Sequence, residues 1–469
     1  MLVHGLVAYQ FNTSSSLTAS STGWTNITNT KSEITKTYSA SSNGTYYFYV
    51  KDASGNINKK SVAITKIDKT KPTITTPTAS GITDGSLTIN TTFNDANSGL
   101  SKIVVYYKTS SSSTYTSKTT TYTTMNGGTT GATGSQSKSI TISNLASGTT
   151  YNIYVVGYDV AGNSVQSSTI TTNTKKYVAQ IGSTKYETLA AAINAAGTSA
   201  TTILMLDNTQ ESVTIPSTKS ITLNLSGKTV TGNMTNQGKL TLTGGGKIAA
   251  NSGNVIVNSG NLTLSGSTID GYNATIAVVN TSGTFNMSSG TISGGNYALQ
   301  VSGGSANTTG GTITSKVGGT ATTVWVLQSG KIELKNTTVT NTGGGVAVTN
   351  QTGNGANFII RNRSANYGIS GRPDGYIIAT TNTGPGQASE NVTIYQANSQ
   401  KVLFPTWTEY NGQDDIDWMR AESSNVLVHT VTIYKSSHNN ETGNYNVHIY
   451  SSFNNWTANG FIGNVTLQF

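Results

Sequence analysis

The stretch from Lys401 to Glu422, KVLFPTWTEYNGQDDIDWMRAE, concentrates aromatic and acidic side chains near the end of the chain. It holds two Trp, one Tyr, one Phe and five acids, whereas the whole chain is only 10% charged and 8% aromatic. Aromatic rings stack on the apolar face of a pyranose, and carboxylates accept hydrogen bonds from sugar hydroxyls. The stretch therefore indicates a carbohydrate-binding site.

Two local patterns predict how this region folds. NGQDD is typical of a hairpin turn, with VLFPTW before it and IDWMRAE after it. In NYNVHIY, from Asn444 to Tyr450, strict alternation places Tyr445, Val447 and Ile449 on one face and the residues between them on the other. The predicted ligand-binding residues of this region are Trp407, Asp414, Asp415, Trp418, His448 and Tyr450. The alternative is that both Trp are core residues of a small β domain.

Metal chemistry receives less support from the sequence. His429, His438 and His448 could join Asp414 and Asp415 in a metal site, but their spacing matches no short metal motif. Asp52 and Asp159 each begin an Asp-x-x-Gly-Asn turn; they are either calcium ligands or, as we expect, turn formers. We therefore predict no metal and no cofactor.

A repeat of about 22 residues runs through the middle of the chain. Each repeat contains three short apolar strands, which is typical of a parallel β-helix whose turns stack on one another. The last apolar anchors of successive repeats are Val230, Ile248, Ile269, Ile292, Ile313 and Val339. Before the repeats, TKYETLAAAINAAG predicts a cap helix with a Thr184–Glu187 capping box, a face shared by Leu189 and Ile193, and an end at Gly197. This region resembles the pectate-lyase-like β-helix superfamily.

Relatives of that superfamily include polysaccharide lyases and hydrolases, whose chemistry needs carboxylates that converge. Between Val230 and Val339 the only acids are Asp270 and Glu333, which we place three rungs apart on different strands. The superfamily's catalytic residues therefore do not carry over, and we predict a stalk or recognition surface. Arg361, Arg363, Arg372 and Asp374 are interpreted as a solvated edge. Trp325 is either a sugar-stacking platform and ligand-binding residue or core filler.

Two earlier segments resemble each other. GTYYFYVKDASGN begins at Gly44, and GTTYNIYVVGYDVAGN begins at Gly148; each is an alternating strand that leads into the Asp-x-x-Gly-Asn turn. In the second segment, Tyr151 follows Leu145 at the spacing of a tyrosine corner. Both resemble fibronectin type III or bacterial Ig-like domains. Asp95 follows Pro72 by 23 positions, and the stretch between them has no counterpart in the first segment, so we expect a truncated first domain and a chain that is a fragment.

The last region resembles the group B streptococcal Bsp-like repeat found in Gram-positive surface proteins. The matching residues are Phe404, Pro405, Trp407, Asn411, Gly412, Gln413, Asp414, Asp415, Trp418, His438, Gly443, Tyr445, His448 and Tyr450. The resemblance implies an extracellular or cell-surface location more than it implies a mechanism.

Composition sets the limits of this interpretation. The chain has 469 residues, no Cys, and no apolar run long enough to span a membrane. Its charge is uneven: residues 1–176 carry 14 Lys/Arg and 6 acids (+8), residues 177–377 carry 11 and 6 (+5), and residues 378–469 carry 3 and 7 (−4). The basic N-terminal region, residues 1–176, could bind anionic polymers. Its lysines are scattered, however, and no nucleic-acid-binding motif accompanies them, so we expect these charges to serve solubility.

We predict an all-β chain with tandem Ig-like sandwiches, a right-handed parallel β-helix with a short cap helix, and a small C-terminal β-sandwich. The predicted domains are 1–67 (truncated Ig-like), 68–176 (Ig-like/fibronectin type III), 177–377 (β-helix) and 378–469 (Bsp-like). The favoured function is non-enzymatic adhesion or binding to a cell-wall polymer or a host or environmental glycan. The alternatives are a β-helix polysaccharide lyase or hydrolase, and a phage tail or host-recognition fibre. The sequence leaves the oligomeric state open.

Overall fold

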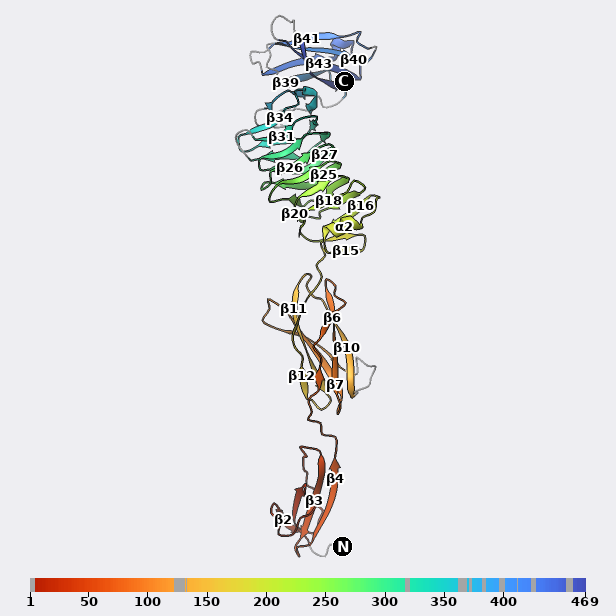
Figure 1. The fold of residues 1–469 in the computed structure, drawn as a ribbon, viewed down its shortest axis with the longest axis vertical. Helices are drawn as coiled ribbons and strands as arrows, with labels where there is room; N and C mark the ends of the chain where they lie inside the picture. The colour runs from red at the N-terminus through yellow and green to blue at the C-terminus, as the bar shows by residue number, and fades with distance from the viewer. Residues whose placement is uncertain are drawn as a thin grey trace. The chain divides into compact units, whose positions relative to one another are not determined.

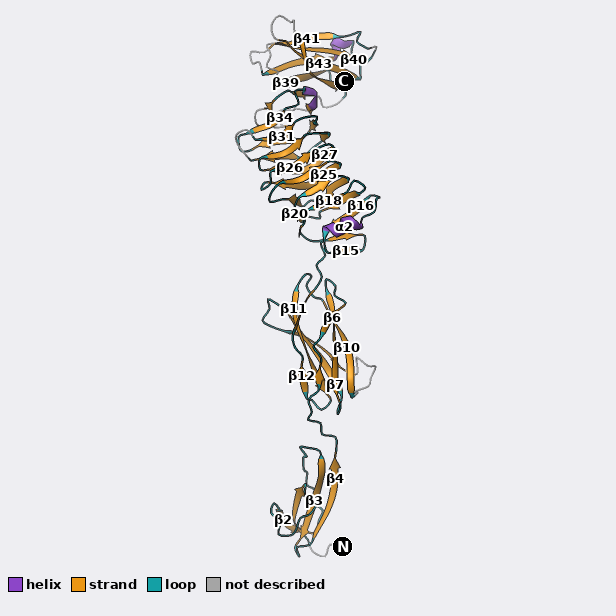
Figure 2. Cartoon of the chain, viewed as in Figure 1, coloured by secondary structure: helices purple, strands orange, loops and turns teal. Residues whose placement is uncertain are grey.

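A computed structural model shows a chain built almost entirely of β-strands, as predicted (Figures 1 and 2). It describes residues 5–121, 131, 133–316, 321–361, 369–370, 373–381, 385–395, 401–410, 412–422, 427–452 and 459–469. The contacts divide the chain into two compact units, Met1–Lys176 and Tyr177–Phe469. Within the described part, no helix is both long enough and apolar enough to cross a membrane.

The first module of unit 1 is a single antiparallel sheet in the order β2-β1-β3-β4. Its strands are β1 (Leu6–Asn12), β2 (Thr25–Thr30), β3 (Gly44–Asp52) and β4 (Ile57–Ile64). The alternating Tyr and Val residues of β3 separate two faces, with Tyr46 and Tyr49 buried. Tyr47 and Phe48, which lie between these two positions, and Val50, which follows them, stay half-exposed, because the described residues provide no second sheet over this one.

The second module of unit 1 is a two-layered sandwich, as predicted. One sheet has the order β10-β7-β5 with β6 beside β7, and the other has the order β12-β11-β8-β9 with β13 beside β11. The strands are β5 (Thr73–Ile74), β6 (Thr78–Ser80), β7 (Ser86–Asp95), β8 (Leu100–Thr109), β9 (Thr116–Thr121), β10 (Gly134–Ser143), β11 (Thr150–Asp159), β12 (Ser164–Gln166) and β13 (Ile170–Asn173). The predicted tyrosine corner is confirmed, because Ala146 N donates to Tyr151 Oη at 2.9 Å.

Unit 2 begins with a cap over the first turn of the β-helix. It consists of β14 (Ala179–Ile181), β15 (Thr184–Tyr186) and α2 (Leu189–Ala195). The helix, its end and its buried face are confirmed, but the predicted Thr184–Glu187 capping box is wrong. The N-cap is Thr188, whose hydroxyl accepts from Ala191 N at 3.0 Å. The carboxylate of Glu211 accepts the N–H groups of Leu189 and Ala190, so a residue from beyond the helix completes the cap.

Three parallel columns of strands then form the β-helix. The first column holds β16 (Thr201–Met205), β19 (Ser220–Asn224), β22 (Lys239–Thr243), the starts of β25 (Asn261–Gly271) and β27 (Thr284–Gly294), β29 (Ser305–Thr308), β32 (Lys331–Lys335), β35 (Phe358–Arg361) and β38 (Ile377–Thr380). The second holds β17 (Thr209–Gln210), β20 (Thr229–Thr231), β23 (Lys247–Ala249), the ends of β25 and β27, β30 (Thr312–Ser315), β33 (Thr338–Asn341) and β36 (Ile369–Ser370). The third holds β18 (Val213–Ile215), β21 (Met234–Asn236), β24 (Asn254–Asn258), β26 (Ile276–Asn280), β28 (Tyr297–Val301), β31 (Thr322–Val326), β34 (Val346–Asn350) and β37 (Pro373–Asp374).

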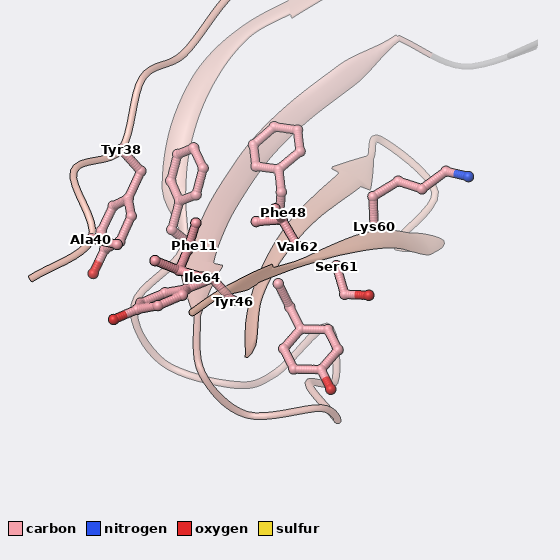
Figure 3. Close-up of a pocket in the computed structure, with 10 residues that line it drawn as sticks. Phe11, Tyr38, Ala40, Tyr46, Phe48, Lys60, Ser61, Val62 and Ile64 are labelled. Carbon is pink, nitrogen blue, oxygen red and sulfur yellow. The ribbon is translucent and has the colours of Figure 1, made fainter. Parts of the chain in front are cut away.

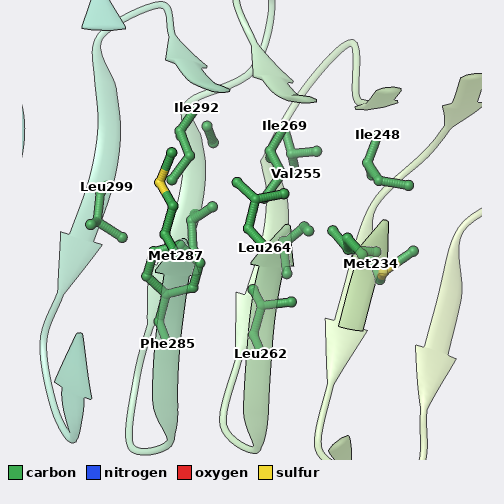
Figure 4. Close-up of a cluster of buried hydrophobic side chains, with 14 of the residues drawn as sticks. Met234, Ile248, Val255, Leu262, Leu264, Ile269, Phe285, Met287, Ile292 and Leu299 are labelled. Atoms are coloured by element: carbon green, nitrogen blue, oxygen red, sulfur yellow. The ribbon is translucent and has the colours of Figure 1, made fainter. Parts of the chain in front are cut away.

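The register confirms all six predicted anchors. Val230, Ile248, Ile269, Ile292, Ile313 and Val339 pair in succession along the second column. Thr209 and Ile369 extend this column at its two ends. The interior between the columns is packed with apolar side chains, several of which Figure 4 shows pointing inward from neighbouring strands. Each rung buries its apolar face only because the next rung covers it.

Buried carboxamides also align along the rod. Asn236 Nδ2 donates to Asn258 Oδ1 at 2.7 Å, and Asn258 Nδ2 donates to Asn280 Oδ1 at 2.6 Å. Asn280 Nδ2 then donates to the carbonyl of Gly303 at 2.8 Å. These three Asn side chains are fully buried, and the ladder satisfies their polar atoms except Asn236 Oδ1, which has no partner among the described residues.

The last part of unit 2 is a sandwich that continues the rod. β38 pairs in parallel with β35 of the β-helix and antiparallel with β39 (Ser389–Tyr395), which pairs with β42 (Val428–Tyr434). The facing sheet has the order β41-β40-β43-β44. Its strands are β40 (Lys401–Thr408), β41 (Asp417–Glu422), β43 (Asn444–Ser452) and β44 (Asn459–Gln468). The predicted boundary between residues 377 and 378 thus falls inside β38, a strand that belongs to both regions.

Candidate functional site

The sheet β41-β40-β43-β44 has one packed face and one open face. Tyr445, Val447 and Ile449 of β43 are fully buried against the sandwich core, which confirms the predicted alternation. β40 and β41 pair antiparallel from Lys401–Glu422 to Thr406–Asp417, which confirms the predicted hairpin. Asn411 of its turn lies outside the described residues. The residues that alternate with the buried ones form the open face, which we call the outward face.

One half of the outward face is aromatic. The rings of Trp407 and His448 meet edge to face, with centroids 4.7 Å apart. Phe461 lies 5.5 Å from His448 and 5.4 Å from Tyr450, again in edge-to-face contacts. Three predicted residues, Trp407, His448 and Tyr450, are therefore brought together. The sequence analysis missed Phe461, which is 48% exposed. A β-bulge at Ile462 shifts the register of β44, so strict alternation would have placed Phe461 on the packed face.

The other half of the outward face is polar. The carboxylate of Glu409 accepts hydrogen bonds from Asn444 Nδ2 at 2.9 Å and Asn446 Nδ2 at 3.3 Å. Thr466 Oγ1 donates to Asn446 Oδ1 at 3.3 Å, and Gln468 Nε2 donates to Asn444 Oδ1 at 3.4 Å. This network spans three strands and adjoins the aromatic half, because Trp407 pairs with Asn446 in the register. Glu409 was counted among the acids of the opening stretch but was not predicted as a site residue.

Trp418 and Asp414 lie at the periphery. Trp418 pairs with Pro405 across β40 and β41 and is 53% exposed, so it is not a core residue. Asp414 is exposed in the hairpin turn. Both side chains remain accessible to a ligand.

Asp415 requires a correction, because the structure buries it. Its side chain is only 4% exposed, and Oδ2 lies 2.8 Å from Nδ1 of the fully buried His438. Oδ1 accepts the backbone N–H of Thr408 at 3.0 Å. The hairpin turn packs against the short helix η2 (Lys435–His438), and His438 at the end of this helix contacts Asp415. Asp415 therefore stabilises the turn and cannot contact a ligand on the outward face.

Burial changes two pKa values in this module. It lowers the pKa of His448 below the ordinary value of 6.5, because the imidazolium would lose hydration among the rings. Burial, together with the nearby charges of Glu441 and Asp415, raises the pKa of Tyr445 to about 12. His448 is therefore uncharged at neutral pH, and the centre of the aromatic half carries no charge.

Trp325 lies elsewhere, on the third strand column of the rod. Its ring stacks on Tyr297 with centroids 5.1 Å apart and planes 23° apart. Its Nε1 is buried and has no hydrogen-bond partner among the described residues. The structure does not bring Trp325 together with the other predicted site residues, and its indole N–H cannot reach a ligand.

Asp270 and Glu333 of the β-helix lie too far apart to act as a catalytic pair. Asp270 lies 3.1 Å from Lys247 Nζ, and Glu333 lies 2.7 Å from Arg361 Nε. They occupy different columns three rungs apart, as predicted. Burial by itself would raise the pKa of Asp270, but hydrogen bonds from Tyr272 N, Lys247 and Ser293 lower it overall. Arg363 and Arg372 lie outside the described residues, and the side chain of Asp374 is not described.

Three carboxylates gather in the second module of unit 1. Asp68, Asp95 and Asp159 each offer one oxygen within 4.8 Å of the others. The sequence separates these residues widely, so the fold creates a cluster that sequence reasoning missed. Asp159 also bonds Asn163 N at 2.7 Å and Asn163 Nδ2 at 2.8 Å, and Asp52 makes the same pair of bonds to Asn56. Both predicted turn formers thus make turn hydrogen bonds, and these distances alone assign no metal.

The first module carries an apolar groove of about 290 Å³, shown in Figure 3. Phe11 stacks on Tyr38 with centroids 4.8 Å apart and contacts Phe48 at 4.9 Å. Tyr38 is 51% exposed and Val62 is 56% exposed. The groove lies over the half-open face of the sheet, and its lining also includes the polar groups of Tyr46, Tyr47, Lys60 and Ser61.

The position of the outward face coincides with a family match. Residues 381–465 match the GBS Bsp-like repeat. The aromatic and polar halves both belong to this Bsp-like repeat, apart from Thr466 and Gln468 just beyond the matched range. No curated protein matches the chain.

Solved structures are similar to the chain at low identity. The FN1–FN3 domains of chicken CNTN1 are 17% identical, with 37% of this chain and 56% of that chain covered and a TM-score of 0.20. Pectate lyase Pel3 from Pectobacterium carotovorum is 12% identical, with 66% and 90% covered and a TM-score of 0.19. Pectate lyase PelI from Erwinia chrysanthemi is 14% identical, with the same coverage and a TM-score of 0.15. The chain spans little more than half of the CNTN1 structure, and these scores carry no argument about function.

Proposed function

We propose that the protein is a non-enzymatic, modular cell-surface protein that binds a glycan through the outward face of its Bsp-like repeat. The observation that supports this most is the division of that face into an aromatic half and a carboxamide–carboxylate half. Aromatic rings offer a stacking surface, and fixed polar groups orient hydroxyls, which is the combination that sugar recognition uses.

The rest of unit 2 suits the role of a support. The β-helix is a rigid stack, and β38 joins it directly to the Bsp-like repeat through strand pairing on both sides. Arg361 of the rod also donates from Nη1 to the carbonyl of Thr466 in the repeat at 2.9 Å. These connections hold the outward face on a fixed base, which lowers the entropy lost when a polymer binds.

An enzymatic role receives less support. Glycoside hydrolysis needs two carboxylates about 5–9.5 Å apart. The two acids between Val230 and Val339 lie on different columns, and each forms an ion pair with a basic side chain. We therefore assign the β-helix to the stalk, together with the two modules of unit 1.

Co-sedimentation of the full chain with purified Gram-positive cell walls and with insoluble neutral polysaccharides tests the proposal. We expect the wild-type chain to sediment with at least one of these polymers and Trp407→Ala to stay in solution. Tyr434→Ala is the matched control, since this Tyr is 52% exposed on the opposite sheet. Retained binding by folded Trp407→Ala, or no binding by the wild type, would contradict the proposal. Release of new reducing ends from any of these polysaccharides would favour the alternative function, a polysaccharide lyase or hydrolase.

A further inference from the structure

Glu409 presents a preorganised carboxylate on the outward face. Asn444 and Asn446 each donate to one of its oxygens, and their own carbonyl oxygens accept from Gln468 and Thr466. No ion pair joins Glu409 to a basic side chain among the described residues. A carboxylate has about four acceptor positions, so two remain for hydrogen-bond donors of a ligand.

The carboxylate lies beside the principal stacking ring. Trp407 and Glu409 alternate along the same chain segment, and alternate residues of a strand lie about 7 Å apart on one face. Glu409 N donates to the carbonyl of Asn444 at 3.0 Å, so the strand pairing continues to this residue. A pyranose stacked on Trp407 therefore directs the substituents at its rim toward the carboxylate.

The charge around this position opposes anions. Residues 378–469 contain three basic residues (Lys401, Arg420 and Lys435). They contain seven acids (Glu390, Glu409, Asp414, Asp415, Asp417, Glu422 and Glu441), which gives a net charge of −4. β43 and β44, which carry most of the outward face, contain no Lys, Arg, Asp or Glu. The register places Lys401 and Arg420 on the same face at the other end of β40, so the charge beside Trp407 is that of Glu409. This carboxylate disfavours an anionic group on a ligand that stacks on Trp407.

We propose that the ligand is an uncharged glycan that presents two adjacent hydrogen-bond donors to Glu409 while one of its rings stacks on Trp407. The donors are either a vicinal pair of hydroxyls or a hydroxyl beside an acetamide N–H. This inference rests on the proposed glycan binding, and it makes Glu409 a specificity-determining residue.

Isothermal titration calorimetry of the full chain with four hexasaccharides tests whether the ligand is uncharged and has two adjacent donors. Cellohexaose and chitohexaose are neutral and 1,4-linked, with adjacent donors on every residue. Laminarihexaose is neutral, but its 1,3-linkages remove adjacent donors from internal residues. Hexagalacturonate has adjacent hydroxyls but carries carboxylates. We expect cellohexaose or chitohexaose to bind at least tenfold more tightly than the other two.

Two variants isolate the carboxylate. Glu409→Gln should weaken binding of the preferred hexasaccharide about tenfold or more, because a charge-assisted acceptor becomes a weaker one. Glu33→Gln makes the same change in unit 1 and should leave the affinity unchanged.

The outcomes separate this inference from the proposed function. Equal affinity for hexagalacturonate or laminarihexaose, or an unchanged affinity in Glu409→Gln, overturns the inference and leaves glycan binding intact. Sedimentation with cell walls without binding to either 1,4-linked neutral hexasaccharide overturns it as well. No binding to any hexasaccharide, wall or polysaccharide overturns the proposed function itself.

Discussion

Carboxylates on the β-helix and on the C-terminal sheet have different partners. Asp270 and Glu333 of the rod lie 3.1 Å and 2.7 Å from basic nitrogens, so each charge is balanced within the protein. Glu409 of the C-terminal sheet is held instead by uncharged carboxamides and stays exposed. A charge balanced by a neighbour mainly supports the structure, whereas a fixed and unbalanced acceptor is available to a ligand. This difference supports the proposal that the rod has a structural role and that the sheet recognises the ligand.

The largest effect we expect is on the stability of the rod. Phe285 is fully buried in the rod interior, and Phe285→Ala should reduce the free energy of unfolding of unit 2 by about 3–5 kcal/mol through lost burial and the cavity left behind. Chemical denaturation followed by circular dichroism measures this. The folded fraction should keep its glycan affinity, and a selective loss of affinity would place recognition on the rod.

The next effect concerns affinity rather than stability. Trp418→Ala and Trp407→Ala both remove an indole from the outward face, but only Trp407 adjoins the Glu409 network. We expect Trp407→Ala to weaken binding more than tenfold, and Trp418→Ala to weaken it less. Isothermal titration of both variants checks this order, and the reverse order would move the site toward the hairpin turn.

A smaller effect is expected from pH, through His448. Its pKa is lowered in the folded state, so below its ordinary value of 6.5 the unfolded chain binds a proton that the folded chain does not. The contribution to stability is therefore complete above pH 6.5 and declines as the pH falls toward the lowered pKa. Thermal unfolding of the wild type and His448→Gln between pH 5 and 8 should show a shallower slope in the variant. Equal pH dependence of the unfolding temperature in the two proteins would contradict a lowered pKa of His448.

The smallest effect is expected at the ion pair of the rod. Lys247 is 43% exposed and Asp270 is 25% exposed, so solvent screens their interaction. Asp270→Asn should change the free energy of unfolding by about 1 kcal/mol or less and leave glycan binding unchanged. Equilibrium denaturation and co-sedimentation measure the two quantities. A loss of glycan binding in this variant would return a ligand-binding role to the β-helix.

Local periodicity explains why much of the fold could be predicted. The anchors from Val230 to Val339 recur because each rung must cover the apolar face of the previous one, and the alternation from Asn444 to Tyr450 follows the pleat of one strand. The second pattern also placed His448 and Tyr450 on one face, whereas the position of Trp407 beside them comes from the pairing of β40 with β43. Both kinds of pattern lie within short stretches of sequence.

The features that escaped prediction depend on contacts between distant residues. Asp415 is buried because a helix some 20 residues later supplies His438, and the remaining free N–H groups at the start of α2 are satisfied by Glu211 from beyond the helix. Asp68 and Asp159 meet only through the folding of the sandwich. No local propensity encodes such contacts, so sequence patterns alone could not separate a structural acid from an accessible one.

The most direct test of the central claim is co-sedimentation of the full chain with purified cell walls and insoluble neutral polysaccharides, carried out in parallel for wild type, Trp407→Ala and Tyr434→Ala. The account predicts that the wild type and Tyr434→Ala sediment with the same polymer and that folded Trp407→Ala remains in the supernatant. Equal sedimentation of all three chains, or of none, would contradict glycan recognition by the outward face.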